Sequence, residues 1–191
     1  MLKLFLILLF LSFAGCAGPI KKVSLEGNTS AATGNAIKKS ATNDLYQLDG
    51  TSAIYEVPVA DGVSYQDVID SLKSLSEGMN FVNPANFPIG EHMKLRGVDP
   101  QGVKEVHSFC NLSMGTEIIL DHPEFLVFAP CRVALYEKPD LNSTLKLFIG
   151  LARPTYDLRN IKNPTPRAVK SAQQLEDALI DLMRKASKGE I

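Results

Sequence analysis

The segment CRVALYE, Cys131 to Glu137, decides how this chain folds. Its side chains alternate between two sides of an extended chain, with Cys131, Val133, Leu135 and Glu137 on one side and the intervening residues on the other. Bulky apolar side chains at alternate positions are typical of a β-strand with one buried face. We therefore expect residues 131–137 to form a strand of a sheet.

Strand patterns also occur on both sides of this segment. Residues 54–59, 104–110 and 145–151 alternate in a similar way. The stretch NFVNPANFPI, residues 80–89, contains two prolines, which remove ladder hydrogen bonds. We expect only a short strand with irregular flanks there.

Three segments carry helix signals. Ser64, followed three residues later by Asp67, has the spacing of a capping box at the start of a helix that ends at Gly78. Asn111 is placed to cap a short helix through Leu120. Residues 171–188 show apolar positions on one face and basic residues near the carboxyl end. The order of elements predicts an α+β fold, a two-layer sandwich in which helices pack on a single mixed or antiparallel sheet.

The segment before this last helix is basic. Residues 152–170 contain five basic residues and one acidic residue, Asp157. We expect a solvated loop there, and contact with an anionic partner is the alternative.

The amino terminus, MLKLFLILLFLSFAGCAG, has the pattern of a bacterial lipoprotein signal peptide over residues 1–15. Lys3 precedes an apolar run from Leu4 to Phe13, which is too short to cross a bilayer as a helix. The residues FAGC resemble a lipobox, in which Cys16 is lipidated and becomes the first mature residue. An ordinary signal peptide or an uncleaved anchor is the alternative.

Residues 16–53 are expected to form the lipidated cysteine and a flexible linker to a folded domain at residues 54–191. The linker is rich in Ser, Thr, Asn, Ala, Gly and Lys and has few large apolar residues. As a flexible coil it would span about 30–37 Å. Ala17 at the second mature position resembles lipoproteins sent to the outer membrane, so we expect a membrane-anchored protein of the cell envelope that faces the periplasm.

Composition excludes some classes of function. A net charge of −1 and the absence of Trp argue against a nucleic-acid partner. The sequence contains no Gly-rich phosphate loop, nucleophile elbow or paired carboxylates at a telling spacing. These observations favour a binding or accessory role over catalysis, and no cofactor is predicted from them.

The run HSFCNLSMGTEIILDHPEFLVFAPCRVALYE, residues 107–137, resembles the bacterial and archaeal family known as domain of unknown function 302 (DUF302). The resemblance implies a compact α+β fold that often self-associates, so a homo-oligomer is a further expectation. It implies no established activity. The matching residues are Phe109, Cys110, Asn111, Met114, Gly115, Pro130, Cys131, Arg132, Tyr136 and Glu137.

Cys110 and Cys131 admit three interpretations. In the periplasm, two thiols that meet are expected to form a disulfide, and buried free thiols are the related possibility. A metal or haem site would draw on these two cysteines together with His107, Met114 and His122. Thiol redox chemistry is the third interpretation, with Arg132 lowering the pKa of Cys131.

Arg132 is interpreted as a partner in a structural salt bridge, and binding of an anionic ligand is the alternative. The leading functional hypothesis is a lipid-anchored envelope protein whose DUF302-like domain binds an unknown small-molecule ligand or serves as an accessory module. The alternative is a periplasmic redox or metal/haem-binding protein that uses Cys110, Cys131 and His107. A purely structural part of an envelope assembly is a third hypothesis.

Overall fold

The structure, a computed structural model, describes residues 52–140 and 143–191. The predicted signal peptide, the lipidation site Cys16 and nearly all of the predicted linker lie outside these residues. None of the helices in the described part combines the length and the apolar character needed to cross a bilayer. The elements are β1 Ile54–Pro58, α1 Tyr65–Gly78, β2 Asn86–Phe87, α2 Ile89–Leu95, β3 Lys104–Phe109, α3 Leu112–Ile119, the 3₁₀ helix η1 Pro123–Phe128, β4 Cys131–Pro139, β5 Leu145–Ala152, α4 Pro154–Leu158 and α5 Pro166–Ala186.

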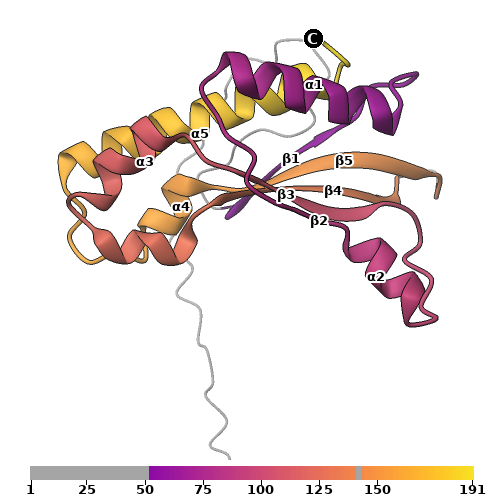
Figure 1. The fold of residues 1–191 in the computed structure, drawn as a ribbon, viewed down its shortest axis with the longest axis horizontal. Coiled ribbons are helices and arrows are strands. Elements are labelled where there is room, and N and C mark those ends of the chain that lie inside the picture. The colour runs from indigo at the N-terminus through magenta and orange to yellow at the C-terminus, as the bar shows by residue number, and fades with distance from the viewer. Residues whose placement is uncertain (1–51, 141–142) are drawn as a thin grey trace, which may run out of the picture. The chain divides into compact units, whose positions relative to one another are not determined.

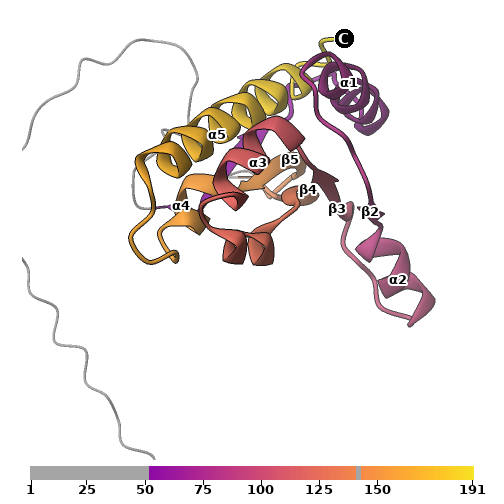
Figure 2. The same ribbon diagram turned by 60° about the vertical axis from the view of Figure 1, so that its left-hand side comes forward.

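The predicted fold class is confirmed. One five-stranded sheet has the order β1-β5-β4-β3-β2, and every neighbouring pair is antiparallel. Helices α1 and α5 lie side by side over one face of this sheet, while α2 projects beyond the β2 edge (Figure 1). Helix α3 packs against α5 at the other end of the helix layer (Figure 2). The segment CRVALYE lies in β4, the middle strand.

The core forms between the sheet and the helix layer. Val133 and Leu135 of β4 pair with Leu151 and Ile149 of β5, and all four side chains are fully buried. The helices cover them with a second set of buried side chains. Each large apolar side chain buried in this way stabilises the fold by about 1.5–3 kcal/mol. The helical set consists of Val68, Leu72, Leu175, Leu179, Leu182 and Met183.

Local capping fixes where the main helices begin. The Ser64 hydroxyl accepts a hydrogen bond from the Asp67 amide at 3.1 Å, and the Asp67 carboxylate accepts one from the Ser64 amide at 2.8 Å. This confirms the predicted capping box. Asn111 caps α3 through the Met114 amide at 3.1 Å, also as predicted.

The prediction of a solvated loop at residues 152–170 is wrong. Helix α4 occupies Pro154–Leu158, and α5 begins at Pro166 instead of at residue 171. Both helices start with proline, whose fixed φ suits the first helical turn, and Thr165 caps α5 through the Ala168 amide. Leu158 is buried in the core, so this basic segment packs against the rest of the domain and is not a solvated loop.

A buried ion pair joins this segment to α5. The carboxylate of Glu176 accepts hydrogen bonds from Nε of Arg153 at 3.0 Å and from the Thr155 amide at 3.1 Å, and Arg153 also donates from its NH2 group at 2.9 Å. The Thr155 hydroxyl donates to the same carboxylate. Arg153 donates further to the carbonyl of Ser52 at 2.8 Å, which ties the start of β1 to the same cluster.

Helix α2 was not expected from the sequence. Its side chains are mostly exposed, and only Gly90 is buried. A Cβ at Gly90 would lie 3.4 Å from the Lys104 carbonyl oxygen, so α2 packs in van der Waals contact with the start of β3.

Candidate functional site

The structure places Cys110 and Cys131 around one small cavity at the end of the β3–β4 pair. Cys131 lies opposite Phe109 in the ladder, and Cys110 follows Phe109 in the chain. Both residues line a cavity of about 40 Å³, which has room for about one water molecule. Both cysteines carry free thiols, so the predicted disulfide is not shown. The other lining side chains are mainly apolar and include Ile119, Phe125, Phe128 and Leu175.

The surroundings of these thiols disfavour thiolate chemistry. Burial raises the pKa of Cys131 to about 12, the charges of Cys110 and Asp157 act in the same direction, and Arg132 opposes them. Burial also raises the pKa of Cys110. Arg132 therefore acts in the predicted direction but is outweighed by burial. Because the thiolate is the reactive form, both reduced cysteines are weak nucleophiles.

Arg132 forms a long ion pair. Its guanidinium lies 3.9 Å from the carboxylate of Asp157, and about half of its side chain is exposed. This contact agrees with the salt-bridge interpretation. Binding of an anion by Arg132 stays a prediction.

The other predicted metal ligands have separate surroundings. Nε2 of His122 accepts a hydrogen bond from the Thr165 amide at 3.0 Å, which positions the start of α5. Met114 lies on α3, where its side chain packs against the core. Within residues 52–140 and 143–191, no group of three or more His, Cys, Asp or Glu side chains is arranged to hold a metal ion.

His107 occupies a different kind of place. It lies on β3 opposite Asn86 of β2, on the sheet face that the helices cover, and is 6% exposed. Its Nε2 lies 2.7 Å from Oε1 of Glu105. The hydroxyl of Tyr65, at the start of α1, donates to the same carboxylate at 2.9 and 3.0 Å. Tyr65, Glu105 and His107 thus form a connected polar chain from α1 to β3.

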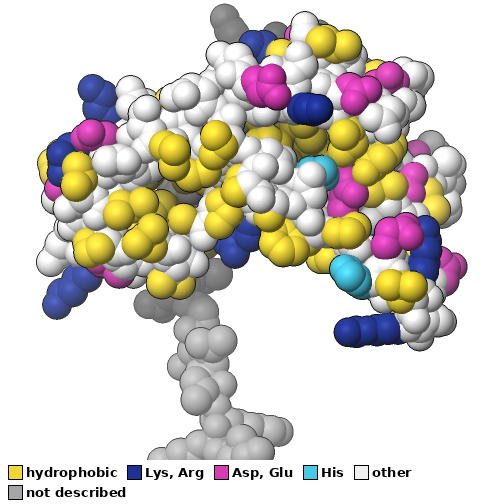
Figure 3. Space-filling model, viewed as in Figure 1, with side chains coloured by type: hydrophobic (Ala, Val, Ile, Leu, Met, Phe, Trp, Pro, Cys, Tyr) yellow, Lys and Arg dark blue, Asp and Glu magenta, His cyan; other side chains and the backbone are white. Residues whose placement is uncertain are grey.

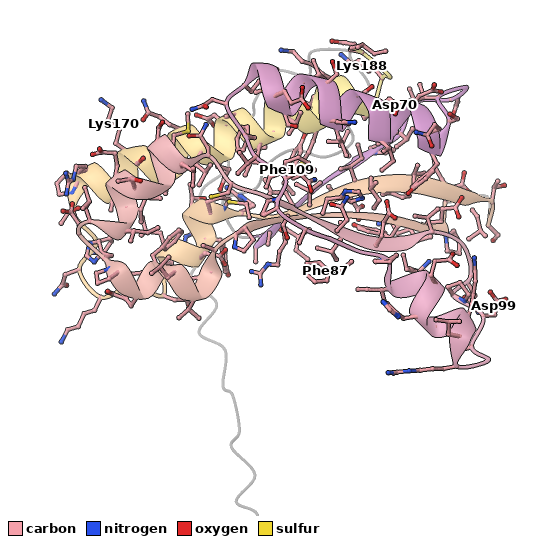
Figure 4. All side chains as sticks on the ribbon, viewed as in Figure 1. Asp70, Phe87, Asp99, Phe109, Lys170 and Lys188 are labelled. Carbon is pink, nitrogen blue, oxygen red and sulfur yellow. The ribbon has the colours of Figure 1, made fainter. Side chains whose placement is uncertain are left out.

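His107, at one end of this polar chain, lines a groove between α1 and the β2–β3 edge, which we call the α1 groove. Its volume is about 540 Å³, within the range of small-molecule sites. Apolar side chains gather beneath α1 in the space-filling view, beside acidic and histidine side chains (Figure 3). Phe109 lies between the helix layer and the sheet, whereas Phe87 of β2 points away on the opposite side (Figure 4). The lining residues are Ile69, Leu72, Lys73, Ser76, Glu77, Phe81, Val82, Asn83, Asn86, His107 and Phe109.

The second ring nitrogen of His107 belongs to a side chain that lines this groove. Among the described residues, no hydrogen bond reaches its Nδ1. The single buried side-chain polar atom without a partner in the described part of the chain is Oγ of Ser71, so Nδ1 is accessible to solvent. His107 is almost wholly buried, and the groove is a hollow that its side chain lines.

Glu105 borders a second hollow, of about 510 Å³, beside α2. Tyr65 lines this hollow as well. Burial raises the pKa of Tyr65 to about 12, and the hydrogen bond from its hydroxyl to Glu105 and the charge of Glu105 act in the same direction. Tyr65 therefore remains a neutral donor to Glu105 at physiological pH.

Sequence reasoning identified His107 but missed its partners. Glu105 and His107 are two residues apart on a predicted strand, so their shared face was available from the alternation. Tyr65 is 40 residues away and comes to Glu105 only through the packing of α1 on the sheet. No local pattern in the sequence signals that contact.

The fold and this groove define a single α+β domain with a hollow between a helix and a sheet edge. The family described as "Domain of unknown function DUF302" matches residues 55–186, and the chain belongs to this family. The crystal structure of an uncharacterized conserved DUF302 protein from Bacillus stearothermophilus has the same fold, with a TM-score of 0.60 and 19% sequence identity. That match covers 70% of this chain and 97% of the other.

A relative in Aquifex aeolicus (strain VF5), described as an uncharacterized protein, is 32% identical over 80 residues. The matched region covers 42% of this chain and 49% of the relative, so the chain spans about half the length of the curated relative it matches. Neither description names an activity or a ligand.

Proposed function

We propose that this protein is a lipid-anchored envelope protein, attached through Cys16 and facing the periplasm from the outer membrane, whose DUF302 domain binds a small ligand in the α1 groove. The observation that carries the binding role is the groove itself, a hollow of about 540 Å³ lined by apolar side chains, by polar and charged ones, and by the almost wholly buried His107. Apolar surface combined with polar groups that fix the orientation of a ligand is a feature of small-molecule sites.

The geometry of β2 offers a matched pair of variants to test this role. Asn86 lies opposite His107 and lines the groove, whereas the next residue, Phe87, points to the other side of the sheet. Both residues are exposed, so a tryptophan at either position leaves the core intact. Asn86→Trp fills the groove, and Phe87→Trp does not.

The probe is Nile red, a neutral dye without a hydrogen-bond donor, whose fluorescence rises in apolar sites. We expect the wild type and Phe87→Trp to bind it equally and Asn86→Trp to bind it at least tenfold more weakly. Circular dichroism checks that all three proteins are folded. Equal binding by Asn86→Trp, or no binding by the wild type, would overturn the binding role.

The anchor is tested separately in cells. Replacing Cys16 by Ser removes the thiol that would carry the lipid, so labelling with a radioactive fatty acid and membrane attachment should both be lost. Replacing Cys110 by Ser in the same assay is the control, because that residue lies in the folded domain. A Cys16→Ser protein that is still labelled and membrane-bound would contradict the proposed anchor.

We also propose that Cys110 and Cys131 close as a disulfide after export, because they line one cavity and an oxidising compartment favours pairing. The bond would stabilise the fold by about 3 kcal/mol through loop closure. Alkylation of the denatured protein from the periplasm, followed by mass spectrometry, counts the thiols. Finding both domain thiols alkylated without prior reduction would refute the bond.

A redox or metal-binding role through Cys110, Cys131 and His107 has weaker support. The two cysteines and His107 line different cavities, and burial raises the pKa values of both thiols. Elemental analysis of the purified protein distinguishes this alternative from the binding role, since a stoichiometric soft metal ion would favour it.

A further inference from the structure

We propose that the α1 groove selects a neutral aromatic ligand carrying one hydroxyl or N–H donor, which donates a hydrogen bond to Nδ1 of His107. Phenols and indole-like rings are the chemical class. This inference rests on the proposed binding function and names the class of ligand that the site would take.

The hydrogen-bond partners of His107 determine which of its ring nitrogens carries the proton. Nε2 lies 2.7 Å from Oε1 of Glu105, and an ionised carboxylate is an acceptor only. The Tyr65 hydroxyl donates to the same carboxylate and so reinforces its role as the acceptor. Nε2 therefore donates to Glu105. On the neutral ring, Nδ1 is then left with a lone pair and no proton.

An unsatisfied acceptor at Nδ1 of His107 costs free energy. His107 is 6% exposed, and a nearly buried polar atom without a partner is costly unless water or a ligand reaches it. The groove that His107 lines offers access to Nδ1. A ligand donor placed there replaces a water molecule and satisfies the nitrogen in a drier environment, where the hydrogen bond is stronger.

Two aromatic side chains of the groove favour an aromatic ligand. Phe81 and Phe109 form an edge-to-face pair with centroids 6.4 Å apart and an interplanar angle of 87°. Both rings line the groove together with Leu72, and a further aromatic ring extends such a pair favourably. The charged lining residues, Lys73 and Glu77, have opposite signs. A neutral aromatic body fits these walls better than an ion of either sign.

The test uses two probes that differ in a single donor, 2-naphthol and 2-methoxynaphthalene. Both are fluorescent and neutral near neutral pH, and only the first can donate a hydrogen bond. We expect the wild-type protein to bind 2-naphthol about 3–10-fold more tightly, the ratio that one net hydrogen bond supplies. In His107→Leu this ratio should fall to about one. His92→Leu, on the exposed helix α2 outside the groove, should keep the wild-type ratio.

A second measurement avoids any loss of folding in the His107 variant. Nitrogen-15 NMR of the wild-type imidazole distinguishes a protonated from an unprotonated ring nitrogen. We expect an unprotonated Nδ1 in the free protein, with a shift characteristic of an accepted hydrogen bond when 2-naphthol is added and none with 2-methoxynaphthalene. A proton on Nδ1 in the free protein would overturn the inference.

The failure of this inference is distinguishable from failure of the proposed function. Equal affinity of the wild type for the two naphthalenes overturns the selection by His107 while leaving a groove that binds apolar ligands. Failure of both naphthalenes to bind, with Nile red still bound in an Asn86→Trp-sensitive manner, also overturns it and leaves the binding role in place.

Discussion

Two carboxylates of this molecule, the buried Glu176 and the partly buried Glu105, have different surroundings. Glu176 is 1% exposed, and its oxygens receive donors from Arg153 and Thr155. Glu105 accepts from the Tyr65 hydroxyl and lies 2.7 Å from Nε2 of His107, and the histidine side chain lines the α1 groove. The first cluster is closed on itself and joins β5, α4 and α5. The second reaches a hollow, and this difference separates a structural ion pair from a candidate binding site.

The comparison also explains why charge alone is a poor guide to function. Residues 152–170 are the most conspicuous basic segment of the sequence, yet Arg153 is buried and used to hold α5. Buried ion pairs of this kind need all their hydrogen bonds, because desolvation costs several kcal/mol per charge. A hydrogen-bond acceptor without a partner in a nearly buried side chain is rarer than a basic segment. It is also better evidence of a binding site.

The largest effect is expected from Glu176→Gln. The change leaves the guanidinium of Arg153 buried beside a neutral amide, so the free energy of unfolding should fall by about 3 kcal/mol. Urea unfolding followed by circular dichroism measures it. Asp181→Asn, which removes an exposed ion pair with Lys185 on the same helix, is the control and should have little effect. If the free energy of unfolding falls only slightly in Glu176→Gln, the cluster around Glu176 does not have this structural role.

A smaller effect on stability is expected from Glu105→Gln. The glutamine keeps the shape and a hydrogen bond to His107, and only one charged acceptor is lost, so the free energy of unfolding should fall by about 1 kcal/mol. The same urea unfolding experiment measures it. A loss as large as that of Glu176→Gln would mean that both carboxylates are primarily structural.

A small gain in stability is expected from Ser71→Ala. Oγ of Ser71 is buried on α1 without a partner among the described residues, and it does not line the groove. Alanine removes the unpaired hydroxyl and has a higher helix propensity, so stability should rise by about 0.5–1 kcal/mol. A decrease in the denaturation midpoint would show that Oγ has a partner in solution.

The smallest effect concerns Tyr65 and appears only at high pH. Its pKa of about 12 exceeds the ordinary tyrosine value of about 10, so its contribution to stability is fully present below pH 10 and is lost as pH rises toward 12. The difference in tyrosinate absorbance between the wild type and Tyr65→Phe should report a pKa of about 12. In Glu105→Gln this pKa should move toward the ordinary value without reaching it, because burial remains. An ordinary pKa in the wild type would contradict the contact with Glu105.

Local signals in the sequence predicted most of the sheet and two helix starts. The alternation of CRVALYE identified β4, and Ser64 with Asp67 identified the start of α1, because both patterns depend on neighbours within a few residues. Helix α4 and the first turn of α5 were missed since their basic residues resembled a solvated loop. The burial of Leu158 depends on packing against elements distant in sequence.

The candidate site was predicted only in part. His107 was singled out from its chemistry, but it was grouped with cysteines that line a different cavity. His122 was also grouped with them, although its ring accepts a hydrogen bond from the amide of Thr165, the residue that caps α5. Side-chain chemistry identifies residues able to act, whereas their grouping is set by contacts between segments as far apart as Tyr65 and Glu105.

The hydrogen bond from Arg153 to the Ser52 carbonyl has a mechanical consequence. A pulling force applied to the chain before Ser52 would act on this hydrogen bond. The Arg153 guanidinium that donates it is held by Glu176 of α5. The force would therefore act on both the edge strand β1 and helix α5, and β1 would separate from the sheet less easily. Forced extension of single molecules from that end should show a lower rupture force once Glu176 is neutralised.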